Sequence, residues 1–261
     1  MMQDSNQATI VYEQPLSERI RTFLRLEFLF RRGRFLLQQE SPWASRLTFE
    51  VIIDVMAVLG RADLKKEIIK ELERHSATLY ALSRNPKVAQ ERLQEVRDEV
   101  HSMLQALHER DTLPGSELRH NELLNAVRQR SSIPAGTCDF DLPAFHYWLE
   151  QPGGQRLRDL NDWFSVFSSF ESSIGLCLRI VRESVAATRE VASGGFFQRN
   201  LGSSTPCQMI RVALSREFPL YPEISAGKQR FAIRFLHPGG AASRPSQTDE
   251  DVEFDLRCCI I

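Results

Sequence analysis

The chain has 261 residues, of which 42% are hydrophobic and 26% are charged, a composition typical of a folded globular protein and unlike that of a disordered or fibrous one. Its 33 Lys and Arg residues balance 34 Asp and Glu residues, and a formal net charge of −1 gives no global attraction to nucleic acid or to an anionic membrane surface. Any site for an anionic partner must therefore be local.

The cysteines and the N-terminal segment favour the cytoplasm as the compartment of this protein. The five cysteines are irregularly spaced and include no C-x-x-C pair, which argues against a disulfide framework or a cysteine-rich zinc site and favours reduced thiols. Residues 1–14 lack the basic start and the apolar stretch of a signal peptide. The apolar run at 28–30 ends at Arg31, far short of the ~20 apolar residues of a membrane span. We expect a soluble cytoplasmic protein.

The first part of the chain predicts one short strand and then helices. Residues 9–12 form a β-rich run, and Ser17 can cap the helix that follows. Apolar residues at helical spacing continue through 43–59 and 64–82. Pro86 then interrupts the pattern, because the residue before a proline is pushed out of the helical conformation.

The segment 93–107 repeats apolar residues with the spacing of a coiled-coil seam. The intervals alternate between three and four residues along Leu93, Val96, Val100, Met103 and Leu107. This helix should pack lengthwise against another. Two interpretations stay open: a helical hairpin that projects as an arm or dimer surface, and an ordinary amphipathic core helix, since the seam lasts only about two heptads.

The middle of the chain predicts three more helices. One should cover 117–130, and an irregular segment dense in turn residues follows it at 132–143. Pro143 is placed to open the next helix. Beyond a break at Gly153-Gly154, a long helix is expected that includes 160–185, with aromatic and aliphatic residues that pack into the core.

From Gly194 the period of the apolar residues changes from helical to two, which is the clearest architectural boundary in the sequence. Apolar and polar residues alternate along 209–215, 230–236 and 252–257. These segments predict an antiparallel sheet with its apolar face on the helices and a mainly polar face outward. The Pro-, Gly- and Ser-rich stretch at 237–251 predicts a long mobile loop.

The predicted fold class is therefore α+β. A predominantly helical domain is expected over 16–193, with a smaller antiparallel β-sheet domain over 194–261 packed on it. A strand near 9–13 would complete the β domain and tie the N-terminus to it.

The common catalytic fingerprints are missing from the sequence. It contains no G-x-S-x-G, H-E-x-x-H or G-x-G-x-x-G motif, and Ala226-Gly227-Lys228 lacks the flanking residues of a phosphate loop. Cys138 and His146 are close enough in sequence for a Cys–His pair, so an enzyme that uses them is an alternative. The prediction is a protein with no catalytic residue, no metal and no cofactor.

The most suggestive feature is a row of basic residues on one strand. Arg230 and Arg234 share a face about 13 Å apart, at ~3.3 Å per residue, and Lys228 lies on the same face. Such a row suits an acidic, extended peptide, because guanidinium groups form forked bonds to carboxylates. The alternative is that Glu253 and Asp255, on another strand, pair with these arginines.

Three groups of segments, in order along the chain, resemble the signatures of a known family. The segments are YEQPLSER at 12–19 with RTFLRLEFL at 21–29, VRQRSSIP at 127–134 with FDLP at 140–143, and LYPEIS at 220–225 with RFAIRF at 230–235. The family that they resemble is ZapD, a family of cell division proteins.

The resemblance implies a non-enzymatic homodimer that binds the C-terminal tail of FtsZ, the tubulin-like protein of the division ring, and bundles FtsZ filaments at mid-cell. Carried onto this sequence, the FtsZ-binding candidates are Arg25, Arg61, His146, Lys228, Arg230 and Arg234. Glu122 stands where the family has a further arginine, and Arg119 lies one turn away as a substitute. A helical scaffold or adaptor for another cytoplasmic partner is the alternative function.

Overall fold

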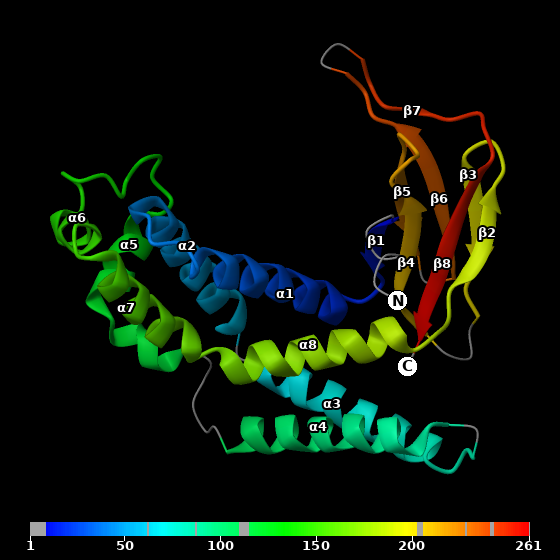
Figure 1. The fold of residues 1–261 in the computed structure, drawn as a ribbon, viewed down its shortest axis with the longest axis horizontal. Helices are drawn as coiled ribbons and strands as arrows, with labels where there is room; N and C mark the ends of the chain where they lie inside the picture. The colour runs from blue at the N-terminus through cyan, green and yellow to red at the C-terminus, as the bar shows by residue number, and fades with distance from the viewer. Residues whose placement is uncertain are drawn as a thin grey trace. The chain divides into compact units, whose positions relative to one another are not determined.

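The structure combines helices with two small antiparallel sheets (Figure 1), which confirms the predicted α+β class. The computed structural model describes residues 9–61, 63–86, 88–109, 115–202, 206–227, 229–240 and 243–260. The chain divides into two compact units. The strand unit consists of the described residues up to Arg21 and from Leu178 onward, and the helical unit is Thr22–Cys177.

The helices lie consecutively in the chain, between the first strand and the second. Their bounds are α1 Glu18–Leu36, α2 Pro42–Leu59, α3 Leu64–Leu82, α4 Gln90–His108, the 3₁₀ helix η1 Ser116–His120, α5 Glu122–Arg130, α6 Pro143–Leu149, α7 Gly153–Ser165 and α8 Ser168–Glu183.

Side-chain caps determine where two of these helices begin. The Ser41 hydroxyl accepts a hydrogen bond from a backbone N–H of the first turn of α2, and Pro42 opens that helix where an N–H would have no helical partner. Asn121 accepts a hydrogen bond from the Leu124 N–H at 2.9 Å and starts α5. The single helix predicted over 117–130 is therefore wrong, because the asparagine cap separates η1 from α5.

The single long helix predicted through 160–185 is also wrong. α7 and α8 meet at an angle of 61°. At the break, the Phe167 N–H donates to the Phe164 carbonyl at 3.1 Å, the shorter-range bond of a 3₁₀ turn. Both phenylalanines are buried, and their rings meet edge to face at 6.0 Å. Within the described residues, no single helix is long and apolar enough to span a membrane. The bent pair α7–α8 meets the same criteria, but by length and composition only.

The predicted seam on α4 packs against α3 within the helical unit. The two helices lie side by side (Figure 1) and are in contact along their length. Leu93, Val100 and Leu107 are buried at intervals of seven residues, while the seam residues between them are partly exposed. The helical hairpin is therefore observed, and the residues of its seam serve the packing of α4 on α3.

The strand unit contains two antiparallel sheets. Their strands are β1 Thr9–Pro15, β2 Thr188–Ala192, β3 Phe196–Asn200, β4 Cys207–Ser215, β5 Tyr221–Ala226, β6 Arg230–His237, β7 Ser246–Gln247 and β8 Val252–Ile260. One sheet has the order β1-β4-β8-β2, and the other has the order β3-β6-β5 with β7 paired to β6. The N-terminal strand β1 pairs along its whole length with β4.

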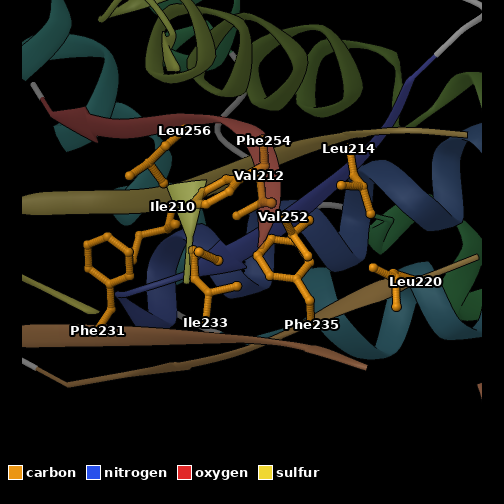
Figure 2. Packing of buried hydrophobic residues seen from close by; sticks show 11 residues of the cluster. Ile210, Val212, Leu214, Leu220, Phe231, Ile233, Phe235, Val252, Phe254 and Leu256 are labelled. Atoms are coloured by element: carbon orange, nitrogen blue, oxygen red, sulfur yellow. The ribbon is translucent and has the colours of Figure 1, made fainter. Parts of the chain in front are cut away.

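The apolar faces of the two sheets cover each other. Figure 2 shows Phe231 and Phe235 of β6 pointing toward residues of the opposite sheet, and the Phe235 and Phe254 rings lie 5.1 Å apart. The prediction of one sheet with its apolar face on the helices is therefore wrong. Alternation along a strand shows that one face is buried, but it does not show whether a helix or a second sheet buries it.

A glycine turn takes the chain from one sheet to the other. Gly194 and Gly195, between β2 and β3, have φ angles of 56° and 71°, and the Phe196 N–H donates to the Ser193 carbonyl at 3.1 Å. Positive φ at both central residues is the requirement of a tight hairpin turn, and glycine meets it without strain.

The segment predicted as a long loop at 237–251 contains β7, which pairs with the end of β6. Thr248 is buried, and its N–H donates to the Phe235 carbonyl at 3.1 Å. The described part of this segment is therefore more ordered than its composition indicates, because backbone pairing with β6 holds it.

Candidate functional site

Arg230 and Arg234 lie on the outward face of β6. The alternate residues of this strand, among them Phe231 and Ile233, are buried in the sandwich, so the two arginines must point the other way, and both are exposed. The third member of the predicted row, Lys228, lies outside the described residues.

Arg234 has a carboxylate neighbour on the adjacent strand. Its Nη2 is 2.6 Å from Oε2 of Glu223, the residue that directly faces it on β5. Both side chains are about half exposed, so water screens the pair and its contribution to stability is small. Arg230 has no ion-pair partner among the described residues. The outward face of β6 thus offers one arginine without such a partner and one in a screened pair.

The alternative interpretation, in which these arginines pair with Glu253 and Asp255, is wrong. Both carboxylates bind Arg189 of β2, at 2.9 Å from Glu253 and 3.3 Å from Asp255. The reason is the sheet topology: β8 belongs to the sheet opposite β6, and the outward faces of the two sheets point away from each other. The carboxylate that competes for the β6 row is Glu223.

The helical unit carries the other predicted basic residues. Arg25 is exposed on α1. Arg61 lies two residues beyond the end of α2, and its Nε is 4.0 Å from the Asp63 carboxylate, with both side chains more than half exposed. Arg25 belongs to α1, whereas Arg61 lies beyond the end of α2. Arg230 and Arg234 therefore share one surface in the strand unit, whereas Arg25 and Arg61 belong to the helical unit.

The α1 surface around Arg25 is both aromatic and basic, which the sequence analysis did not predict. Phe28 and Phe35 are 65% and 63% exposed, and Arg32 lies between them with its Nη2 3.6 Å from Glu50 of α2. Residues three and four apart on a helix share a face, so these side chains form one basic and aromatic stripe with Arg25. The available signal was the seven-residue interval between the two phenylalanines.

His146 lies on α6 beside an open groove. Its Nδ1 is 3.2 Å from Asp139 Oδ1, and the same carboxylate oxygen is 3.2 Å from Nη2 of Arg46. The groove has a volume of about 770 Å³ and includes Trp43 and Ile133 among its apolar lining residues. It lies between α2 and the turn-rich segment after α5, so loop residues of that segment form one of its walls.

Cys138 does not have the environment of a catalytic nucleophile. Its Sγ donates a hydrogen bond to the Asp141 carboxylate at 3.1 Å, and this bond, with a smaller effect of desolvation, raises the pKa of the Cys138 thiol. A nucleophilic cysteine needs a lowered pKa. His146 is bound to Asp139 and not to Cys138. No group of three or more His, Cys, Asp or Glu side chains within the described part of the chain could hold a metal ion.

Glu122 and Arg119 occupy neighbouring elements. Glu122 is the first residue of α5, and Arg119 belongs to η1. Both are exposed, and the carbonyl of Arg119 accepts a hydrogen bond from Asn125 Nδ2 at 2.7 Å. The Arg119 guanidinium is thus accessible beside the acidic residue at 122.

Comparisons with known proteins agree on one family. The family model ZapD, described as a cell division protein, matches residues 24–234. A protein of Methylococcus capsulatus, named cell division protein ZapD, is 40% identical over 252 residues, which are 97% of this chain and 98% of that protein. Proteins of the same name from Coxiella burnetii and Cupriavidus metallidurans are 37% and 38% identical over 97% and 96% of this chain, and over 98% and 99% of their own lengths.

Proposed function

Because the chain belongs to the ZapD family of cell division proteins, we propose that it binds the C-terminal tail of FtsZ and, as a homodimer, crosslinks and bundles FtsZ filaments at the division ring. It would act in the cytoplasm at mid-cell, without catalysis. The observation that supports tail binding most directly is the outward face of β6, where Arg230 and Arg234 are exposed beside a single carboxylate.

The chemistry of this face suits an acidic peptide in extended form. A guanidinium can donate two parallel hydrogen bonds to one carboxylate, so two arginines four residues apart can each hold one acidic side chain. Glu223 would be displaced from Arg234 by such a peptide, at little cost because the pair is half exposed. Arg25, Arg61, His146 and Lys228 are proposed as additional contacts.

Weak single contacts are sufficient for this function. A filament presents many tails, and a dimer presents two copies of the site. Once one copy has bound, the second binds at the effective concentration set by the tether, so modest affinity becomes stable crosslinking.

Co-sedimentation with FtsZ filaments tests the proposal. The double variant Arg230→Ala/Arg234→Ala should stay folded and yet pellet with filaments much less than the wild type. A matched control is Arg189→Ala, which removes an equally exposed arginine from the opposite sheet and should leave co-sedimentation unchanged. FtsZ that lacks its C-terminal tail should fail to recruit the wild type.

The variant Glu223→Gln sharpens the test. It removes the carboxylate that competes for Arg234 without removing the hydrogen-bonding side chain, so tail affinity should rise. If the double arginine variant is folded and pellets as the wild type does, the tail docks elsewhere, and the next residues to replace are Arg25 and Arg61.

A helical scaffold for another partner is the second candidate function. The observation that favours it is the open apolar groove beside Trp43, whose side chain is 75% exposed. This candidate predicts that the wild type does not pellet with FtsZ, whether or not the tail is present.

A further inference from the structure

Two neighbouring strands of one sheet, β4 and β8, each place a cysteine at the same end of the sandwich. Cys258 of β8 faces Ile210 of β4 across the ladder, and Ile210 belongs to the core, so Cys258 also points inward. The register of β4 shifts between Cys207 and Met209, where two residues of β4 advance against one residue of β8. Such a bulge turns the next side chain to the other face. Cys207 therefore also packs against the core, on the same inward face as Cys258, which is two residues from its partner Ile260 on β8; the Cys207 Sγ donates a hydrogen bond to the Met209 carbonyl at 3.4 Å.

A polar pair from two further strands lies beside the thiols. Arg199 of β3 and Glu190 of β2 form an ion pair at 2.6 Å. The Arg199 guanidinium also acts on Cys258 through its charge and a hydrogen bond. Both thiols are only partly buried, so small solutes can reach this end of the sandwich.

The surroundings of the two thiols shift their pKa values in opposite directions. The hydrogen bond with Cys207, opposed by desolvation and aided by Arg199, lowers the pKa of Cys258 to about 7. The same hydrogen bond between the side chains, together with desolvation, raises the pKa of Cys207. One partner is thus a nucleophilic thiolate near neutral pH, and the other holds its proton.

We propose that Cys207 and Cys258 form an oxidisable thiol pair, a redox modification site at which a hydroperoxide converts the two thiols into a disulfide between β4 and β8. The proposal is independent of FtsZ binding. It rests on the bulge that aims Cys207 inward, on the shared inward face that places Cys207 and Cys258 on neighbouring strands, and on the neighbouring guanidinium.

The chemistry balances with hydrogen peroxide as the oxidant. The Cys258 thiolate sulfur attacks one peroxide oxygen, the O–O bond breaks, and the hydroxide that leaves takes up a proton to give water. Cys258 is then a sulfenic acid. The Cys207 sulfur attacks the Cys258 sulfur and loses its proton, the S–O bond breaks, and the oxygen leaves as a second water. Two thiols are oxidised to one disulfide, and one peroxide is reduced to two waters.

The other cysteines provide internal controls. Cys259 faces Met209 on the opposite side of β8, and burial is the main reason that the pKa of its thiol is raised to about 11. Cys177 is fully buried in α8, and Cys138 is hydrogen-bonded to Asp141. Selective oxidation should therefore spare these three.

Mass spectrometry of the reduced full-length protein tests the site. After treatment with hydrogen peroxide, the intact mass should fall by two hydrogen atoms, and peptide mapping should find a Cys207–Cys258 crosslink. The variants Cys177→Ser and Cys259→Ser should crosslink as the wild type does. Cys207→Ser and Cys258→Ser should not, and circular dichroism should show both to be folded.

The two serine variants also separate the roles of the thiols. Cys207→Ser should retain a sulfenic acid on Cys258 that dimedone labels, whereas Cys258→Ser should react with peroxide at least tenfold more slowly at pH 7. In the wild type, the rate should rise between about pH 6 and pH 8 as Cys258 ionises. A gain of oxygen atoms with no crosslink, or dimedone labelling that starts at Cys138 or Cys259, would overturn the proposal.

Discussion

Arg156 is a buried cation that holds several loops of the helical unit by their carbonyl groups. It is only 5% exposed, and no carboxylate is bound to it among the described residues. Instead it donates hydrogen bonds to four oxygens, those of Ser45 Oγ at 3.2 Å, Leu149 O at 2.9 Å, Gln151 O and Glu40 O. A buried charge is tolerated only when it is fully hydrogen-bonded, and this one connects α7 to the loop between α1 and α2, to the start of α2 and to the end of α6.

Replacing Arg156 should therefore destabilise the protein. Arg156→Ala leaves buried carbonyl groups without donors and should lower the free energy of unfolding by about 3 kcal/mol. The measurement is urea denaturation followed by circular dichroism. Arg158→Ala, on an exposed position of the same helix, is the matched control and should change the midpoint little. Equal effects of the two variants would contradict the structural role.

Glu13 is a carboxylate of the strand unit that is bound by two arginines. Its carboxylate accepts hydrogen bonds from Arg182 of α8 and from Arg211 of β4, at 2.8 Å each. Desolvation is the largest single influence and opposes ionisation, but the hydrogen bonds and charges of the two arginines together outweigh it and lower the pKa of Glu13 below its ordinary value of 4.5.

Stability should accordingly fall as acid protonates Glu13. A lowered pKa in the folded state means that the unfolded chain binds the proton more readily, so the contribution of Glu13 is present above pH 4.5 and is lost as pH drops through the lower folded pKa. Glu13→Gln should be less stable than the wild type at pH 7, and the difference should shrink toward about pH 3. Thermal denaturation at both pH values measures it. A difference independent of pH would contradict the assignment.

At the scale of elements, β6 shows how one strand serves two purposes. Its inward residues build the core of the sandwich, and its outward residues build the proposed binding face. Phe231 is fully buried, so Phe231→Ala should cost about 3–5 kcal/mol of unfolding free energy. Phe196→Ala, on an exposed position of β3, is the control. A denaturation midpoint that Phe231→Ala leaves unshifted would show that the two sheets do not pack as described.

The elements that sequence predicted best are those whose signal is local. The helices at 43–59 and 64–82 match α2 and α3 closely, because apolar spacing and the proline at 86 act within one or two turns. The failures at 117–130 and 160–185 have a different origin. A cap at Asn121 and the burial of both Phe164 and Phe167 depend on contacts that a periodic pattern does not reveal.

At the scale of the whole molecule, crosslinking requires two tail-binding sites. We therefore expect a homodimer, with a mass in sedimentation equilibrium at micromolar concentration about twice the 30.0 kDa of the chain. The Arg230→Ala/Arg234→Ala variant should give the same mass. A wild-type protein that sediments only as a monomer would rule out the proposed crosslinking mechanism.

Bundling should also depend strongly on salt. The β6 arginines face solvent, and charges there are screened beyond about 8 Å at physiological ionic strength. Turbidity of FtsZ filaments with the wild type should therefore fall steeply as salt increases, under conditions in which filaments alone persist. Bundling that high salt leaves unchanged would point to an apolar contact, such as the groove beside Trp43.

The sequence by itself determined the fold class, most helices, the alternation that turns Arg230 and Arg234 to one face, and the resemblance to the ZapD family. Each of these depends on residues near one another in the chain. Only the tertiary structure decided that two sheets cover each other, that Glu223 and not Glu253 faces Arg234, and that Cys207 and Cys258 share the inward face of neighbouring strands. The physical reason is that strand order and a one-residue bulge bring together residues about 10 to 50 positions apart in the chain. The alternation of apolar residues along a strand carries no information about strand order or about bulges.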